Sequence, residues 1–289
     1  MKILLFGGDG QLGFEIKKKA FDLNFNLIAP VISEVDISNF DQVKRLTHDF
    51  IPDIVVNCAA YTAVDNAEND QDTAFLINKV GAQNVAVAAQ DCGARVVHIS
   101  TDYVFPGDTS TALTENAPTC PLNVYGISKL AGEDDVLSAT NNQALILRTS
   151  SLFGLKGPNF IATMLKLFSS GRPVKIVSDQ VMSPTWAGWL AEVILDLCRI
   201  KCSGIINACC SGEVSWYDFA VEAYKLSGGE AKYPARTQLV PIFADDFIRP
   251  AKRPKYSVLN CSKLTSILGR APISWQDGLR GYLKDCGLV

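Results

Sequence analysis

Short apolar runs alternate with amphipathic stretches through the first half of the chain. The runs predict β-strands at Lys2–Phe6, Asn26–Ala29, Ile54–Asn57, Arg95–Ser100 and Ala144–Arg148. Such alternation is typical of βαβ units and of a parallel sheet covered by helices on both faces. The expected fold class is therefore α/β, a Rossmann-type doubly wound parallel sheet followed by a smaller C-terminal α/β portion.

Residues that begin and end helices mark the stretches between the runs. One helix opens at Gln11, and another starts after Ser38, a favoured N-cap residue. A long helix is expected over Asp70–Cys92, because the next residue, Gly93, is of the type that ends helices. Another follows Pro121. Glycine and proline become frequent after residue 148, and further helices are expected at Asn159–Phe168, Thr185–Cys198, Ser215–Leu226 and Trp275–Lys284.

Composition narrows the class of protein. Of the 289 residues 48% are hydrophobic and 20% are charged, which is ordinary for a globular protein with a real core. The formal net charge of -3, the pI of about 5.5 and the lack of a basic stripe argue against nucleic acid as a partner. The first apolar run is too short for a signal sequence, and no run of about 20 apolar residues predicts a membrane span. We expect a cytoplasmic protein that does not contact membranes.

The cysteines and histidines do not form a metal-binding pattern. The nine cysteines are odd in number, and several lie in apolar runs, so reduced thiols are expected rather than disulfides. Cys198 and Cys202 lack a second pair of ligands, and the chain has only two histidines, His48 and His98. We expect no structural metal site.

A glycine-rich turn follows the first predicted strand and reads Gly7-Gly-Asp-Gly-Gln-Leu-Gly13. Glycines at Gly7, Gly10 and Gly13 let the backbone turn tightly and approach a pyrophosphate, which the N–H groups at the helix start, near Gln11 and Leu12, would bind. A glycine-rich turn without a ligand is the alternative. The position of the turn at the start of an alternating β/α chain favours dinucleotide binding.

Two further segments bear on the cofactor. The stretch 26–34 holds no Arg or Lys for a 2′-phosphate, which favours NADH or a loose choice between NADH and NADPH. We expect Asp36 and Ile37 beside the adenine. The small residues of Ala59-Ala60-Tyr61 would let the nicotinamide ribose and phosphates cross the sheet edge; a buried strand that merely needs small side chains is an equal alternative.

Tyr125 precedes Lys129 by one helical turn, so the two side chains share a helix face. The phenol suits an acid that protonates an alkoxide, and a neighbouring ammonium lowers the pKa of a phenol. Upstream, Thr101 offers a hydroxyl that can hold the same oxygen. The Tyr-x-x-x-Lys spacing alone is common by chance, so its weight depends on the upstream motifs.

Several motifs occur in order at fitting spacings, and together they cover nearly the whole chain. They resemble those of the extended short-chain dehydrogenase/reductase family. Besides the glycine loop, the resemblance lies in Asn57-Cys-Ala-Ala-Tyr-Thr-Ala-Val-Asp65, Ser100-Thr-Asp-Tyr-Val-Phe-Pro-Gly107, Pro121-Leu-Asn-Val-Tyr-Gly-Ile-Ser-Lys-Leu-Ala-Gly-Glu133 and Arg148-Thr-Ser150. The second and third of these are the specific parts, and the glycine loop is generic.

The resemblance implies an oxidoreductase that uses NAD(P)H to reduce the C4 ketone of dTDP-4-dehydro-L-rhamnose to dTDP-L-rhamnose, as in dTDP-rhamnose and polysaccharide biosynthesis. Tyr125 would protonate the alkoxide, Lys129 would lower the pKa of Tyr125 and hold the nicotinamide ribose, and Thr101 would polarise the ketone. Residues 1–150 are expected to form the NAD(P)-binding Rossmann domain and residues 151–289 a nucleotide-sugar-binding portion, with the chain crossing between them.

The resemblance also implies contacts to the nucleotide sugar. The implied contact residues are Val64, Asp102, Tyr103, Ser151, Asn159 and Arg253. Arg253 would pair with the diphosphate, and a surface Arg before Pro254 is the less favoured alternative. Asp102 could instead cap a loop. His98 lies inside a predicted strand and is interpreted as a packed core histidine.

Two departures from the family pattern affect the substrate and the assembly. The family often has Trp after Arg-Thr-Ser as a wall for the sugar, and here Ser151 follows. Some members bridge dimers through Mg²⁺; Glu15 matches one ligand position, but the stretch Trp186-Ala-Gly-Trp-Leu offers no second acid. We expect a monomer or homodimer without a Mg²⁺ bridge.

Two rival functions stay open. One is a reductase or epimerase of another nucleotide-linked 6-deoxy-4-ketohexose, which the missing Trp permits. The other is a non-catalytic partner protein, like the regulatory subunit of methionine adenosyltransferase, which resembles the same family. The presence of Thr101, Tyr125 and Lys129 argues against the second.

Overall fold

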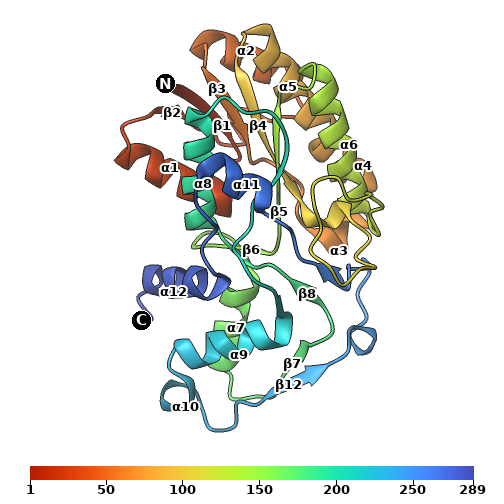
Figure 1. Cartoon of the computed structure of the whole chain (residues 1–289), viewed down its shortest axis with the longest axis vertical. Helices are drawn as coiled ribbons and strands as arrows, with labels where there is room; N and C mark the ends of the chain where they lie inside the picture. Colours follow the sequence, from red (N-terminus) through yellow and green to blue (C-terminus); the bar gives the residue numbers. More distant parts are fainter.

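Six parallel strands form the central sheet of the computed structural model, which describes all 289 residues. Their order across the sheet is β10-β5-β4-β3-β1-β2 (Figure 1). The bounds are β1 Lys2–Phe6, β2 Asn26–Ile28, β3 Ile54–Asn57, β4 Arg95–Thr101, β5 Leu145–Thr149 and β10 Gly204–Asn207. Every neighbouring pair is parallel. The expected doubly wound α/β fold is confirmed.

Helices cover both faces of the sheet (Figure 1). On one face α1 (Gln11–Asp22) packs against α8 (Ala187–Arg199). On the other, α5 (Ala82–Asp91) packs between α2 (Phe40–Phe50) and α6 (Val124–Ala139). Strands buried on both faces need apolar residues throughout, which explains why they read as continuous apolar runs.

The strand order changes direction between β1 and β3, which gives the sheet a switch point at its carboxyl edge. From β1 the chain continues to β2 on one side, while β3 lies on the other, so the loops after β1 and β3 diverge at this point. Ligands of open α/β sheets bind at such switch points. The glycine loop and the Ala59–Tyr61 segment meet here.

Apart from α8 and β10, most of the chain after residue 150 builds the smaller part of the molecule, at the bottom of Figure 1. Its helices are α7 (Phe160–Phe168), α9 (Trp216–Leu226), α10 (Gly229–Lys232) and α12 (Trp275–Asp285). Its short strands are β6 (Leu152–Phe153), β7 (Val174–Val177), β8 (Val181–Met182), β9 (Thr185–Trp186), β11 (Val214–Ser215), β12 (Leu239–Ile242) and β13 (Tyr256–Ser257).

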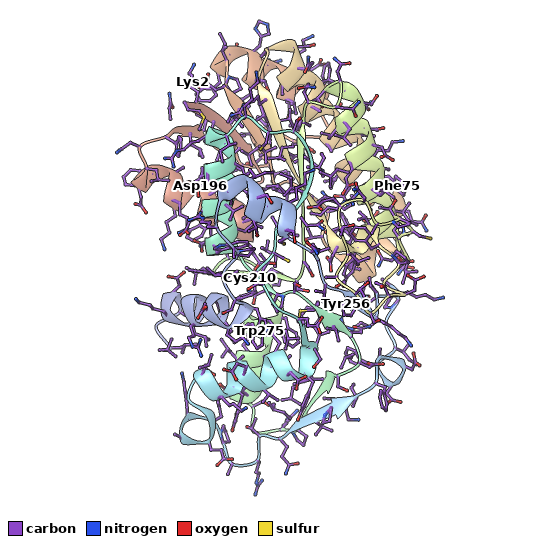
Figure 2. The ribbon with its side chains drawn as sticks, in the orientation of Figure 1. Lys2, Phe75, Asp196, Cys210, Tyr256 and Trp275 are labelled. Atoms are coloured by element: carbon purple, nitrogen blue, oxygen red, sulfur yellow. The ribbon has the colours of Figure 1, made fainter.

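An aromatic cluster continues the large core into this part. Phe219 packs edge-on against Phe153, with ring centroids 5.4 Å apart, and against Trp275 at 5.7 Å. Figure 2 shows Trp275 at the junction of the two parts. These residues belong to the same buried cluster as Ile3 of β1 and Ile54 of β3. The two parts therefore share one hydrophobic core.

Several elements differ from the sequence-based expectations. The strand β10 and the helix α11 (Ser262–Leu268) were not expected. Asn39, rather than Ser38, caps α2 by accepting a hydrogen bond from the Gln42 backbone N–H at 3.2 Å. Asn competes well with Ser at this position, so residue type alone cannot choose between neighbours.

The long helix over residues 70–92 is interrupted. It consists of α4 (Gln71–Phe75), a π-helical turn over Leu76–Gly81, and α5. Such turns are rare and often accompany functional sites. Short helices also lie at α3 (Val64–Ala67), Asp102–Val104 and Ala244–Asp246. No helix of the structure combines the length and the apolar character needed to cross a membrane.

Candidate active site

Thr101 and Tyr125 lie on two neighbouring elements, β4 and α6. Thr101 ends β4, and Tyr125 lies in the first turn of α6, whose N-cap Asn123 accepts a hydrogen bond from the Gly126 N–H at 2.8 Å. A Cβ on Gly126 would lie 2.3 Å from the Tyr103 carbonyl oxygen. Glycine at this position therefore allows α6 to approach the loop that follows Thr101.

The Lys129 side chain is buried beneath this loop, with only 2% exposed. Its Nζ donates to the Ile99 carbonyl oxygen at 2.6 Å and lies 3.3 Å from His98 Nε2. Burial lowers the pKa of Lys129 to about 8, against the opposing effect of Glu133. The ammonium therefore gives up its proton within the pH range in which enzymes work.

Burial also has the largest effect on Tyr125, and it raises the pKa of the phenol well above its usual value. A hydrogen bond with Thr101 opposes the rise, and the nearby Asp102 and Tyr103 add to it. The lowering expected from Lys129 is not among these influences. At neutral pH the phenol keeps its proton, which is the form that a general acid requires.

Asp102 lies behind Thr101 and is 2% exposed. Its two carboxylate oxygens accept hydrogen bonds from Thr101 Oγ1 at 3.0 Å and Ser150 Oγ at 2.8 Å. Burial raises the pKa of Asp102 to about 6, although hydroxyl donors, Ser257 foremost, oppose the shift. Asp102 therefore fixes the Thr101 hydroxyl and stays out of the cleft described below.

The glycine loop is packed as closely as a pyrophosphate site requires. Gly7 has φ of +79°, and a Cβ there would lie 2.5 Å from the Ala59 backbone nitrogen. A Cβ on Gly13 would lie 2.2 Å from the Gly7 carbonyl oxygen. At the start of α1, Gly10 provides no side-chain cap, and the buried Gln11 Oε1 has no hydrogen-bond partner. Backbone N–H groups at the helix start and glycine-only packing fit a dinucleotide phosphate.

Gly13→Ala should lower the free energy of unfolding by about 1–3 kcal/mol, because the new methyl must displace backbone. It should also weaken dinucleotide binding, since the displaced backbone belongs to the phosphate loop. Urea unfolding and a cofactor fluorescence titration measure the two effects. Gly10→Ala is the matched control for stability, because its Cβ would meet only the Gly7 carbonyl oxygen at 3.4 Å. Equal destabilisation by both substitutions would contradict the packing argument.

Asp36 and Ile37, predicted to lie beside the adenine, belong to the connection between β2 and α2. Asp36 Oδ1 accepts from the Ser38 N–H at 2.9 Å and its hydroxyl at 2.8 Å, so Asp36 holds a tight turn. Ile37 is buried against Gly81, where a Cβ would lie 2.7 Å from the Ile37 side chain.

Asn78, in the π-helical turn, is a site residue that the sequence did not reveal. Its side chain accepts from the Tyr61 N–H at 2.8 Å and donates to the Tyr61 carbonyl at 3.1 Å. It also donates to Ser128 Oγ of α6 at 2.9 Å. One amide thus ties the Ala59–Tyr61 segment to the helix of Tyr125 and Lys129. The only available signal was a buried polar residue in an apolar helix.

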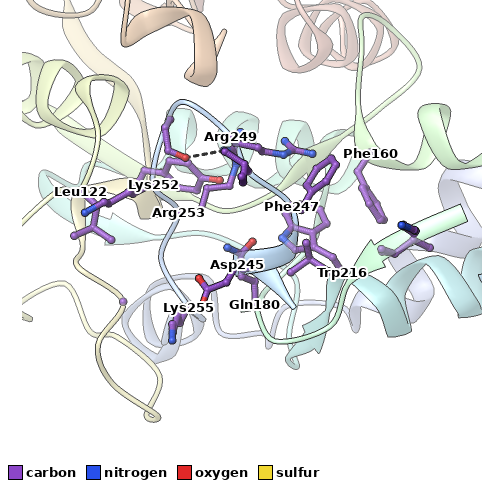
Figure 3. A pocket seen from close by; sticks show the side chains of 18 of the residues that line it. Leu122, Phe160, Gln180, Trp216, Asp245, Phe247, Arg249, Lys252, Arg253 and Lys255 are labelled. Atoms are coloured by element: carbon purple, nitrogen blue, oxygen red, sulfur yellow. Dashed lines mark hydrogen bonds between the residues drawn. The ribbon is translucent and has the colours of Figure 1, made fainter. Parts of the chain in front are cut away.

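A cleft of about 1200 Å³ opens beside this constellation (Figure 3). Tyr103 connects the two, because it lines the cleft and its ring packs edge-on against Tyr125 at 5.7 Å. An aromatic pair, Phe160 and Trp216 with ring centroids 4.6 Å apart, also lines it. Besides Arg253, four other cations line it, namely Lys175, Arg249, Lys252 and Lys255. This combination suits a ligand with a planar ring and a negative charge. Sequence reasoning missed the aromatic pair and these four other cations.

Only some of the residues that were predicted to contact the sugar line the cleft. Tyr103 and Arg253 line it, whereas Val64, Asp102, Ser151 and Asn159 do not. Asn159 caps α7, accepting from the Ala162 N–H at 2.9 Å and donating to the Gly154 carbonyl at 2.8 Å. Ser151 has a left-handed φ of 46° at the turn into β6.

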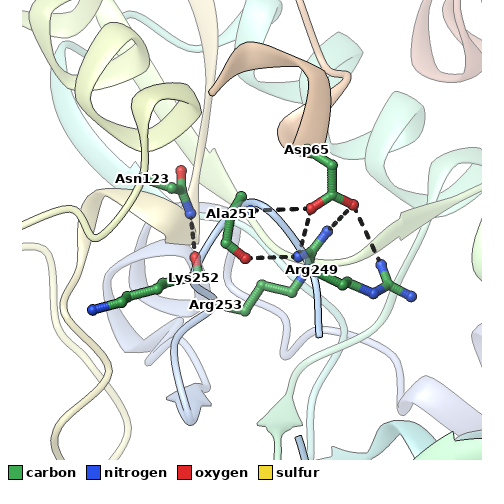
Figure 4. Close-up of polar contacts among 6 residues, drawn as sticks. All are labelled: Asp65, Asn123, Arg249, Ala251, Lys252 and Arg253. Carbon is green, nitrogen blue, oxygen red and sulfur yellow. Dashed lines mark hydrogen bonds and ion pairs between the residues drawn. The ribbon is translucent and has the colours of Figure 1, made fainter. Parts of the chain in front are cut away.

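Arg253 forms an ion pair with Asp65, a residue from the first half of the chain (Figure 4). Its two terminal nitrogens donate to the two Asp65 oxygens at 2.9 and 2.8 Å, and one also donates to the Ala251 carbonyl. These hydrogen bonds lower the pKa of Asp65. The guanidinium expected to bind phosphate is therefore committed to a carboxylate. Arg249 is freer, with 43% of its side chain exposed and a looser 3.7 Å contact to Asp65.

The chain matches the family model described as RmlD substrate binding domain over residues 1–287. It is 36% identical to dTDP-4-dehydrorhamnose reductase of Escherichia coli strain K12, with 99% of this chain and 98% of that protein covered. A crystal structure of a dTDP-4-dehydrorhamnose reductase from Clostridium acetobutylicum superposes with a TM-score of 0.94 at 39% identity, covering 99% of this chain and 100% of the other.

A second solved structure, dTDP-4-dehydrorhamnose reductase from Bacillus anthracis strain Ames in complex with NADP, superposes with a TM-score of 0.92 at 34% identity. The match covers 98% of this chain and 99% of that one. The family model and these relatives agree over nearly the full length. The chain therefore belongs to the RmlD substrate-binding-domain family.

Proposed function

We propose that this protein reduces the C4 ketone of dTDP-4-dehydro-L-rhamnose to dTDP-L-rhamnose with NADPH or NADH. One observation carries the proposal above all: a protonated Tyr125 packs against Tyr103, which lines a cleft with cationic and aromatic walls. The similarity to dTDP-4-dehydrorhamnose reductases, one of them solved with NADP, supports the substrate and the cofactor.

The cofactor would be held along the carboxyl edge of the sheet. The glycine loop from Gly7 to Gly13 would take the pyrophosphate, Asp36 and Ile37 would border the adenine, and Lys129 would bind the nicotinamide ribose. When bound, the nicotinamide supplies the hydride that reduces the ketone carbon.

The chain itself handles the proton. Tyr125 donates its phenolic proton to the oxygen that becomes the C4 hydroxyl, and the Lys129 ammonium stabilises the phenolate that remains. Thr101 Oγ1 lies next to Asp102, and rotation of its hydroxyl toward the substrate would place a second donor on the same oxygen. Burial of these groups excludes water and strengthens their interactions.

The nucleotide would occupy the cleft. Its diphosphate would meet Arg249 and the neighbouring lysines, because these cations are less committed than Arg253. Its base would pack against the aromatic pair Phe160 and Trp216. In this arrangement Arg253 positions the segment that carries Arg249 by anchoring it to Asp65.

Purified protein should oxidise NADPH or NADH when dTDP-4-dehydro-L-rhamnose is supplied, and proton NMR should identify dTDP-L-rhamnose as the product. The measurement is the loss of absorbance of the reduced nicotinamide. dTDP-4-keto-6-deoxy-D-glucose is the matched comparison substrate. Faster turnover of this second sugar would shift the function to a reductase of another 6-deoxy-4-ketohexose. Failure to turn over any nucleotide sugar would favour the non-catalytic partner protein.

A further inference from the structure

His98 is a buried titratable residue without a part in the mechanism above. It lies in the middle of β4 with 1% of its surface exposed, directly opposite Asn57 of β3. Its ring is placed between two polar side chains. Nδ1 lies 3.2 Å from Asn57 Nδ2, and Nε2 lies 3.3 Å from Lys129 Nζ. Both ring nitrogens therefore have a polar neighbour, as buried polar groups require.

The hydrogen bonds around Asn57 determine which ring nitrogen carries the proton. Asn57 Oδ1 accepts the Ala59 backbone N–H at 3.1 Å, so the amide group Nδ2, a donor, faces His98. His98 Nδ1 must therefore accept, and in the neutral ring the proton then lies on Nε2. Burial, and secondarily the charge of Lys129, lowers the pKa of His98 well below its usual value, which keeps the ring neutral.

The Nε2–H of His98 points at Lys129 Nζ. An ammonium there would bring two donors face to face, whereas an uncharged amine accepts from His98 and still donates to the Ile99 carbonyl oxygen at 2.6 Å. The hydrogen bonds of this buried chain are therefore all satisfied when Lys129 is neutral. The contact with His98 favours loss of the lysine proton.

Two other titratable groups act on Lys129. Glu133, on the same helix, favours the ammonium, but its carboxylate is paired with Arg148 at 2.6 Å. Cys58, after β3, is a weak acid whose pKa burial raises to about 12, so it stays uncharged. His98 is the one of the three that contacts Nζ within hydrogen-bond distance.

We propose that His98 is a positioning residue of the reaction. By donating its Nε2–H to Lys129 it favours the uncharged amine, and so sets the pH range over which Lys129 carries the charge that assists Tyr125. This inference rests on the proposed function. It extends that function by making the Asn57–His98–Lys129 chain the device that tunes the lysine.

The tautomer of His98 can be measured without any turnover. Nitrogen-15 NMR of the wild-type protein at pH 9 should show a neutral His98 ring with its proton on Nε2. The assignment is simple because His48 is the only other histidine, and His48→Asn removes its signals. A proton on Nδ1, or an imidazolium, would overturn the proposal. Because it uses the wild-type protein, this NMR measurement tests the proposal even if substitution of His98 prevents folding.

The pH profile tests the effect on the reaction. In wild type kcat/KM should fall as the pH rises through about 8, because Lys129 loses its proton there. His98→Asn keeps an acceptor for Asn57 but cannot reach Lys129, so the alkaline limb should move up by about 0.5 to 1 pH unit. His48→Asn, on the exposed face of α2, is the matched control and should leave the limb in place.

If the alkaline limb of the kcat/KM profile stays in place or moves to lower pH in His98→Asn, His98 is only a packing residue and the proposal is overturned. If wild type turns over no nucleotide sugar, the proposed function fails instead. The NMR measurement would then still show whether the His98 proton lies on Nε2, as donation to Lys129 requires.

Discussion

Tyr125→Phe should lower kcat/KM for ketone reduction by at least about a hundredfold, the effect of removing a positioned general acid. The substitution deletes only the hydroxyl, so the ring can keep its edge-on contact with Tyr103 at 5.7 Å. Cofactor affinity should change little, because Lys129 and the glycine loop are untouched. Steady-state kinetics with dTDP-4-dehydro-L-rhamnose and a cofactor fluorescence titration separate the two quantities.

Tyr282→Phe is the matched control for this experiment. Tyr282 is also a tyrosine packed against an aromatic ring, but it is buried, with 3% exposed, in α12 against Phe153 and away from the reacting groups. It should retain turnover close to wild type. Unchanged turnover in Tyr125→Phe would remove Tyr125 from the mechanism, whatever the control shows.

Arg148→Met should lower the free energy of unfolding by about 3–5 kcal/mol, because it leaves the Glu133 carboxylate buried without a partner. In the structure Arg148 Nε and Nη2 donate to Glu133 at 3.0 and 2.6 Å, and the side chains are 3% and 1% exposed. The pair joins β5 to α6, the helix that carries Tyr125 and Lys129. Urea unfolding followed by circular dichroism measures the loss.

Two comparisons make this prediction specific. The double substitution Arg148→Met with Glu133→Leu should recover most of the loss, because no unpaired charge then stays buried. Arg280→Met breaks the exposed 3.3 Å pair with Asp277 and should cost at most about 1 kcal/mol. Similar losses for Arg148→Met and Arg280→Met would show that water reaches the Glu133 pair.

The first half of the fold could be predicted because its signals are local. Strands buried on both faces must be apolar throughout, and Gln11 and Gly93 lie at helix ends that their neighbours define. The second half gave weaker signals. The strand β10 offers only Ile205 and Ile206 as an apolar pair, and its partner β5 lies far away in sequence. Pairing at such distance leaves no local periodicity to detect.

In the candidate site, too, only the features that local sequence signals determine could be predicted. The placement of Thr101, Tyr125 and Lys129 was predictable because strand end and helix spacing determine it. The contacts that influence the protonation of Lys129 could not be predicted, because His98 and Asn57 meet only when β3 and β4 pair. Nor could the sequence show that Arg253 is bound by Asp65, a residue 188 positions earlier.

The strand β10 has a consequence for any attempt to divide the protein. A fragment that ends at residue 150 would lack β10 and would expose the edge of β5, whose five residues are all buried in the whole protein. Such an edge presents a row of unpaired N–H and C=O groups on an apolar strand and is prone to join other chains. During synthesis, the sheet likewise stays open at this side until residues 204–207 have emerged and paired, so the nascent first half needs protection from aggregation for that interval.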